Sequence, residues 1–159
     1  SSHLIKPSLY YVERSQKTLQ EVMEVRAIFE TEVARLAARN RTEADLLRLE
    51  EINNKMILPE STMEGRAKCD LDFHMAMAEC SQNALLYRLL HGLQDVLLHG
   101  RREVLRAPEA GTRAMREHEA VLQAVRDQDE EKAQQAMQHH LTITGESMKK
   151  FTMDEYWGD

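Results

Sequence analysis

Apolar residues recur along most of this chain every three or four positions, which is the spacing of one face of an α-helix. The first stripe predicts a helix over about residues 18–39 and consists of Val22, Val25, Phe29, Val33, Leu36 and Ala37. A second stripe follows a capping signal at Thr42 and consists of Leu46, Leu47, Leu49 and Ile52. Further helices are predicted over residues 64–80, 84–106, 112–126 and 130–151. No segment shows the apolar–polar alternation of a strand, so the pattern predicts an all-α bundle of about six to seven helices.

The breaks between these helices suggest the domain organisation. Pro108 and Gly111 are expected to separate the fourth helix from the fifth, because both residue types are unfavourable inside helices. Residues 1–15 are expected to form an arm or linker remnant, residues 16–153 one ligand-binding domain, and residues 154–159 a tail.

Composition narrows the possible functions. The 159 residues carry a net charge of −6, which argues against this segment itself following a nucleic-acid backbone. The chain has no apolar run long enough for a membrane span, and its two cysteines fit reduced thiols better than a disulfide framework. We therefore expect a cytoplasmic protein that does not contact the membrane.

Four side chains that can bind metal lie on the inward faces of the predicted helices. Asp70 and His74 are four residues apart, so they project from one side of a helix. His118 and His140 each lie within an apolar stripe of a later helix, whereas His139 points away from that stripe. Buried imidazoles need partners, and one bound ion could serve all four groups.

The chemistry of this set favours a divalent transition metal. Imidazole and carboxylate ligands suit zinc first, with nickel, manganese or iron as alternatives. Three histidines and one aspartate leave one or two coordination positions open. The alternative for each residue alone is structural: an i,i+4 surface pair of Asp70 and His74, and core histidines with ordinary partners.

Charged residues on two other stripes are candidates for binding a ligand next to the metal. Arg26 and Glu30 lie on the inward face of the first helix, where a guanidinium offers a fork for a carboxylate. They could equally form an internal pair that braces the bundle. Arg101 lies at the edge of the fourth helix's stripe and could instead extend to solvent.

The ordered set of motifs resembles a known family. Its parts are Glu24-Val25-Arg26 with Glu30, Asp70-Leu71-Asp72-Phe73-His74, Ser81-Gln82-Asn83, Glu117-His118-Glu119, and Ala136-Met137 followed by His140-Leu141. Together they resemble the C-terminal effector-binding (FCD) domain of FadR-type regulators in the GntR family of bacterial transcription factors. The resemblance covers residues from about 20 to 151.

The resemblance implies a fold and a function. It implies an antiparallel helical bundle with a central metal and ligand pocket, in which Asp70, His74, His118 and His140 hold the metal and Arg26 faces the ligand. It also implies a small carboxylate effector, a homodimer and no enzymatic activity. The winged helix-turn-helix domain of the family is absent from this chain, so operator DNA would be bound only through that missing N-terminal domain.

Two other classes of function fit the residues. A metal-dependent hydrolase or oxygenase could use the open metal position, with Glu30 or Asp72 as the general base. A dimerisation module could use the metal for structure alone.

Overall fold

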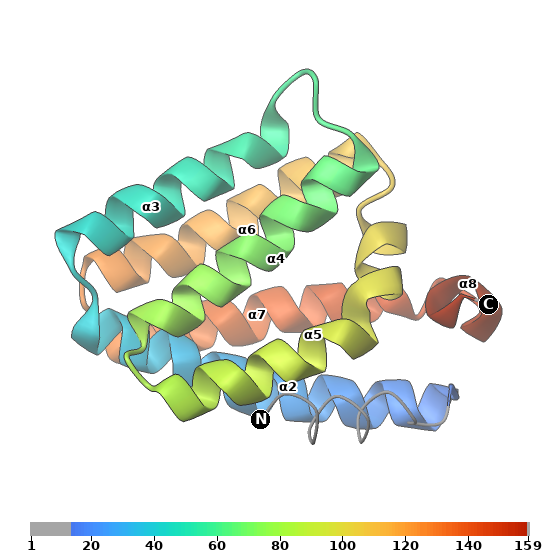
Figure 1. Cartoon of the computed structure of the whole chain (residues 1–159), viewed down its shortest axis with the longest axis horizontal. Helices are drawn as coiled ribbons and strands as arrows, with labels where there is room; N and C mark the ends of the chain where they lie inside the picture. The colour runs from blue at the N-terminus through green and yellow to red at the C-terminus, as the bar shows by residue number, and fades with distance from the viewer. Residues whose placement is uncertain (1–13, 159) are drawn as a thin grey trace.

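The computed structural model describes residues 14–158, and within this range the chain is entirely helical (Figure 1). The helices are α2 (Gln16–Asn40), α3 (Glu43–Asn54), the short 3-10 helix η1 (Lys55–Ile57), α4 (Met63–Cys80), α5 (Ala84–Val104), α6 (Pro108–Arg126), α7 (Glu130–Met148) and α8 (Met153–Trp157). The predicted all-α bundle is confirmed. Residues 1–13 of the expected arm lie outside the described residues.

The long helices pack so that α4 lies at the centre. Helix α2 lies along α7, which also packs on α6, while α4 packs on α2, α3 and α5 (Figure 1). All six residues from Phe73 to Ala78 are buried, which places this half of α4 inside the bundle on every side. Asp70 and His74 are therefore carried by the most enclosed helix of the domain.

Small side chains allow the close packing around this centre. Helix α2 presents Ala34, Ala37 and Ala38, all fully buried, to the core. Capping side chains fix where helices begin: Thr42 and Asp45 form a reciprocal capping box at α3, and Asn83 accepts a hydrogen bond at α5. Burial and capping together determine the direction in which each helix points its polar side chains.

The expected break between the fourth and fifth helices is present, but it lies at residues 105–107 and does not include Pro108 or Gly111. Helix α6 begins at Pro108, because proline is well tolerated in the first turn, where its missing N–H costs no hydrogen bond. Gly111 lies inside α6, and a Cβ atom there would come within 2.6 Å of Cδ of Arg66. This glycine is therefore needed for close packing and not for a turn.

Two residues assigned to apolar stripes are exposed: Val25 on α2 and Leu47 on α3. The last predicted helix ends at Met148 instead of residue 151. Residues 153–157, most of which were expected to belong to a tail, form α8, which packs on α5.

No helix within residues 14–158 is long and apolar enough to cross a membrane.

Candidate metal centre

The structure brings together the four side chains selected from the sequence. Asp70 and His74 come from α4, His118 from α6 and His140 from α7, and one potential ligand atom from each lies within 4.8 Å of all the others. All four residues are buried. In contrast, His139 is exposed, as its direction on the helix predicted.

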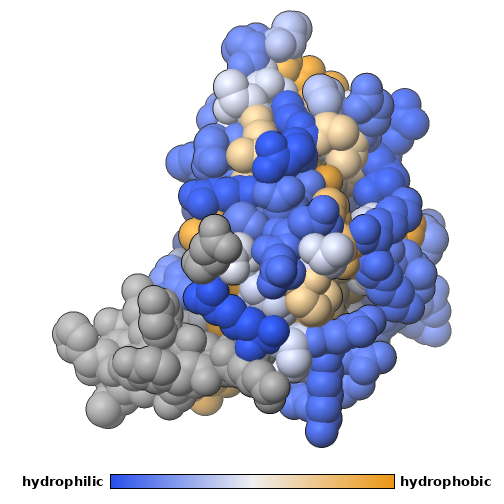
Figure 2. All heavy atoms as spheres, turned by 90° about the vertical axis from the view of Figure 1, so that its right-hand side faces the viewer, coloured by the Kyte–Doolittle hydropathy of each residue, from blue (hydrophilic) through white to orange (hydrophobic). Residues whose placement is uncertain are grey.

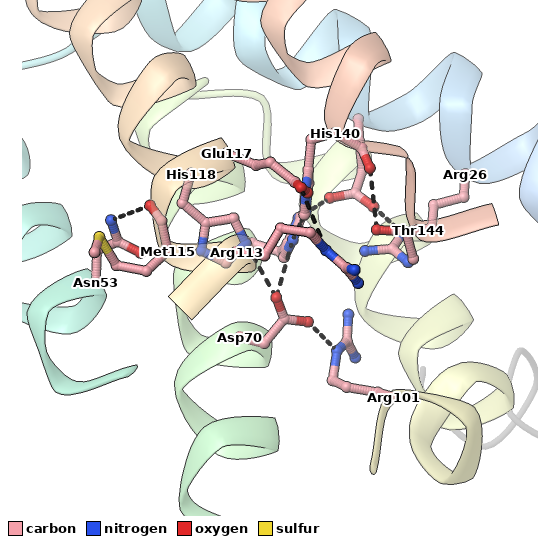
Figure 3. Close-up of polar contacts among 12 residues, drawn as sticks. Arg26, Asn53, Asp70, Arg101, Arg113, Met115, Glu117, His118, His140 and Thr144 are labelled. Atoms are coloured by element: carbon pink, nitrogen blue, oxygen red, sulfur yellow. Dashed lines mark hydrogen bonds and ion pairs between the residues drawn. The ribbon is translucent and has the colours of Figure 1, made fainter. Parts of the chain in front are cut away.

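Each imidazole is oriented through its Nδ1 atom. Nδ1 of His74 contacts Oε1 of Glu30, Nδ1 of His140 lies 2.6 Å from Oε1 of Glu117, and Nδ1 of His118 lies 3.0 Å from Oδ1 of Asn53. The Asn53 amide donates its own N–H to the carbonyl of Met115, so its oxygen is free to accept (Figure 3). All three partners are acceptors, so each Nδ1 carries a proton and donates it.

This arrangement leaves the three Nε2 atoms facing one another. Nε2 of His74 lies 3.3 Å from Nε2 of His140, and Nε2 of His118 lies 3.0 Å from Oδ1 of Asp70. Lone pairs in such close contact repel unless a proton or a cation lies between them. Metal-binding histidines are typically held in this way, with the second ring nitrogen donating to a carboxylate or carbonyl oxygen.

The pKa values of His118, His140 and Asp70 favour the protonation states that bind metal, which are neutral imidazole and ionised carboxylate. Burial lowers the pKa of His118 to about 3 and also lowers the pKa of His140, so both are neutral at pH 7. Burial raises the pKa of Asp70, but Arg101 and His74 outweigh it and hold that pKa well below its usual value.

His74 behaves differently, since burial lowers its pKa but Glu30 and Asp70 outweigh burial and raise it. Without an ion, the raised pKa therefore favours a second proton on His74, and a divalent cation would take the place of that proton. The residues present fit a metal ion: the Asp70, His74, His118 and His140 cluster could hold one, with imidazole and carboxylate ligands of the kind that zinc and other divalent transition metals accept.

Arg26 and Glu30 form the internal ion pair that was one of the two expectations for them. Nε of Arg26 donates to Oε2 of Glu30, and both side chains are buried. The other carboxylate oxygen of Glu30 contacts His74, so Glu30 links the guanidinium to the metal cluster. Arg26 also lines the cavity beside the cluster, so the pair does not exclude a ligand-facing role for Arg26.

Arg101 is buried and does not extend to solvent. Its Nε donates to Oδ2 of Asp70 at 2.6 Å, on the side of the carboxylate away from the histidines (Figure 3). Neither of its terminal nitrogens has a hydrogen-bond partner among the described residues, although both are fully enclosed. Buried donors without partners are rare and costly, so these two atoms require an acceptor, either an ordered water or a ligand.

A cavity of about 30 Å³ adjoins the cluster and is lined by both polar and apolar side chains. Its charged and polar lining residues are Arg26, Asp70, Arg101, Arg113, Glu117, His140 and Thr144. Figure 3 shows the guanidiniums of Arg26, Arg101 and Arg113 turned toward the same region. These three guanidiniums outnumber the two carboxylates in the lining, those of Asp70 and Glu117, which favours an anionic ligand. The space holds little more than a carboxylate group, so a larger acid requires the half-exposed Arg113 side chain to move.

Sequence reasoning missed three residues of the site: Asn53, Glu117 and Arg113. Glu117 precedes His118 in the chain, yet its carboxylate serves His140 on the next helix. Arg113 lies 3.7 Å from Glu117 and donates a hydrogen bond to Ser147. Arg113 and Glu117 share a helix face at i,i+4 spacing, which was the one available signal.

Comparison with known proteins agrees with the geometry. Residues 21–142 match the FCD domain family. The regulator LutR of Bacillus subtilis is 36% identical over 132 residues, covering 80% of this chain and 60% of its own. The putative L-lactate dehydrogenase operon regulatory protein of Escherichia coli is 28% identical over 139 residues, covering 85% of this chain and 53% of its own. The chain thus spans little more than half the length of these curated relatives.

A solved structure shows the same fold. The E. coli protein McbR/YncC superposes with a TM-score of 0.73 at 18% sequence identity, covering 87% of this chain and 71% of that one. The relatives named here are transcription regulators and not enzymes. With most of its length matched, this chain belongs to the FCD domain family of GntR-type transcription regulators.

Proposed function

We propose that this domain senses a small carboxylate by binding it to a metal ion held by Asp70, His74, His118 and His140. The observation that carries the proposal is the pair of buried terminal nitrogens on Arg101, which face the cavity with no acceptor among residues 14–158. The carboxylate of a ligand bound there would accept two charge-assisted hydrogen bonds from Arg101. Another part of the same ligand would complete the coordination of the ion. Zinc is the expected metal, with nickel, manganese and iron as alternatives.

The effector we propose is a hydroxy acid. One relative is a putative L-lactate dehydrogenase operon regulator and another is a galactonate operon repressor, and lactate and galactonate are both hydroxy acids. A hydroxyl next to a carboxylate gives two oxygens that can reach one metal ion. Arg26 and Arg101 would then hold the acid, while Glu30, named with them as an effector residue, would act by keeping Arg26 and His74 in place.

Regulation would involve a DNA-binding domain in the same protein. In the proposed parent protein a winged helix-turn-helix domain precedes α2 and binds operator DNA, and two copies act as a dimer in the cytoplasm. Effector binding would stabilise one arrangement of the helices and so change how the two DNA-binding domains are held.

An enzymatic use of the same metal finds less support. Glu30 is bound on both oxygens, by Arg26 and His74, and is therefore not free to accept a proton from water. Asp72 pairs with Lys68 at 2.8 Å on the outer side of α4. A purely structural metal would leave the donors of Arg101 without an explanation.

The proposal is tested by calorimetry with L-lactate and D-galactonate on zinc-loaded and metal-stripped protein. Arg101→Lys keeps the charge but loses the fork, so it should weaken binding about 10-fold or more. Its neighbour Arg102 is half-exposed and pairs with Glu64, so Arg102→Lys is the control and should bind normally. Equal binding by stripped and loaded protein, or unchanged binding by Arg101→Lys, would overturn the proposal.

A further inference from the structure

Helix α8 lies beyond the part of the chain that matches the FCD family, which ends at residue 142. It is nonetheless firmly attached to the bundle. Thr152 and Glu155 form a reciprocal capping box, and Nε2 of His99 on α5 lies 2.8 Å from the carbonyl oxygen of Glu155. Figure 2 looks onto the end of the bundle where α8 lies and shows a mostly hydrophilic surface there. Helix α8 therefore packs as an ordered element over this end of the bundle.

Tyr156 is the residue that α8 inserts into the bundle, and it is fully buried. Its ring lies directly against Gly100 of α5: a Cβ atom at Gly100 would be 2.0 Å from the ring carbon Cε2 and 2.7 Å from the hydroxyl oxygen. Only glycine permits this approach. The phenol is therefore held beside the backbone that carries Arg101.

The hydroxyl of Tyr156 is enclosed and has no hydrogen-bond partner among the described residues. Arg101 follows Gly100 in the chain, and its two terminal nitrogens are likewise enclosed and without a hydrogen-bond partner among the described residues. Tyr156 belongs to the same hydrophobic cluster as Met148, with Val104 packed against that cluster, and Met148 and Val104 also line the cavity next to the metal cluster. Donors without partners thus lie in the hydrophobic cluster and in the cavity that it borders.

One acceptor group placed between Arg101 and Tyr156 could serve all three of these atoms. A guanidinium only donates, and a neutral phenol donates readily, so the shared partner must accept, as carboxylate oxygens do. We propose that Tyr156 of α8 is an effector-binding residue, whose hydroxyl donates a hydrogen bond to the carboxylate held by Arg101, with Met148 moving aside as the acid enters. This inference rests on the proposed function and extends the pocket to the C-terminal helix.

The ionisation of the phenol agrees with a donor role. Burial raises the pKa of Tyr156 to about 12, while the nearby charges of Arg26 and Arg101 act in the opposite direction. The hydroxyl therefore keeps its proton at neutral pH. Methionine is also suited to the movement required, because its unbranched side chain changes conformation easily.

The test is calorimetry of zinc-loaded wild type and Tyr156→Phe with L-lactate and D-galactonate. Tyr156→Phe removes one hydroxyl that has no partner within residues 14–158, so zinc content and the melting temperature without ligand should stay the same. Affinity for the acid should fall about 10-fold. Tyr87→Phe, on the same bundle but lining a separate groove, is the control and should bind like wild type.

The possible results separate this inference from the proposed function. Weaker binding by Tyr156→Phe alone supports it. Equal affinity of wild type and Tyr156→Phe overturns it and shows that the hydroxyl does not bind the acid, while the metal-dependent site stands. If wild type binds neither acid, both the inference and the proposed function are overturned for this ligand class.

Discussion

Glu117 and His140 are joined across two helices: Nδ1 of His140 on α7 donates to Oε1 of Glu117 on α6 at 2.6 Å. This contact turns Nε2 of His140 toward the cluster, 3.3 Å from Nε2 of His74. The carboxylate thus fixes both the orientation of the ring and the nitrogen that is available to bind an ion.

Removing a ligand should empty the metal site. His118→Ala and His140→Ala are each expected to lower metal content from close to one ion per chain and to lower the melting temperature, because three ligands bind a divalent ion less tightly than four. Elemental analysis and thermal unfolding measure both. His139→Ala is the control, since His139 is exposed; loss of metal in this variant but not in His140→Ala would contradict the assignment.

Removing the carboxylate behind a ligand should weaken the site without emptying it. Glu117→Ala is expected to lower metal affinity about 10- to 100-fold, measured by competition with a chelator. Glu119 lies two residues further along α6 and pairs with Arg126 at 3.6 Å, away from the cluster. Glu119→Ala should therefore keep the wild-type affinity, and equal effects of the two variants would show that the contact to His140 is unimportant.

The ligand set could be predicted from the sequence because helical spacing alone gives the direction of a side chain. Asp70 and His74 share a face at i,i+4, and His140 differs from His139 by about 100° around the axis. Asn53 and Glu117 could not be found in this way. Their roles depend on how α3 packs on α6 and α6 on α7, and spacing within one helix carries no information about its neighbours.

Sequence signals within one segment do not give helix boundaries and burial correctly where packing between helices determines them. Pro108 and Gly111 predict a break after the fourth helix, and the break exists, but it ends at Pro108, which begins α6, and Gly111 lies inside α6 and makes room for Arg66. Leu47 fitted a stripe yet lies in solvent, since α3 packs on α4 and α6 through Leu46 and Leu49 on its other side. Residues 153–157 are too few to show a periodic pattern, so α8 was not expected.

Arg26 should matter for stability as well as for binding. Arg26→Ala would leave the fully buried Glu30 carboxylate without its cation, which typically costs about 3–5 kcal/mol. Urea unfolding of metal-free protein measures this loss. Replacing both partners, with Arg26→Met and Glu30→Gln, removes the uncompensated charge and should recover most of the stability; a double variant as unstable as Arg26→Ala would argue against this origin.

Self-association is expected as a two-fold dimer, at least within the intact regulator. Helix α5 exposes Leu85 and Leu89, which lie one turn apart on the same face. Charging this face with Leu85→Glu and Leu89→Glu should shift the protein toward monomer in sedimentation velocity. Leu47→Glu on α3 is the control for an equally exposed leucine. A stable trimer or ring would contradict the prediction, because two operator half-sites require two-fold symmetry.

Acid should destabilise the metal-free domain through His118. Its pKa is about 3 when folded against about 6.5 when unfolded, so the unfolded chain takes up the proton first. A lowered histidine pKa gives stability that is present above pH 6.5 and is lost as the pH falls toward 3. Between pH 7 and pH 5 this one residue should cost about 2 kcal/mol. His140 acts in the same direction, whereas the raised pKa of His74 gives stability that is present below pH 6.5 and is lost as the pH rises through its folded value.

The contribution of His118 is isolated by comparing wild type with His118→Asn, which cannot take up the proton. Urea unfolding of both metal-free proteins at pH 7 and pH 5 should show that wild type loses about 2 kcal/mol more than the variant. Metal-loaded wild type should lose its ion over the same range, because protons compete with the metal for imidazole. Parallel pH profiles of wild type and His118→Asn would mean that folding does not lower the pKa of His118, and the neutral state assigned to His118 in the folded protein would then be wrong.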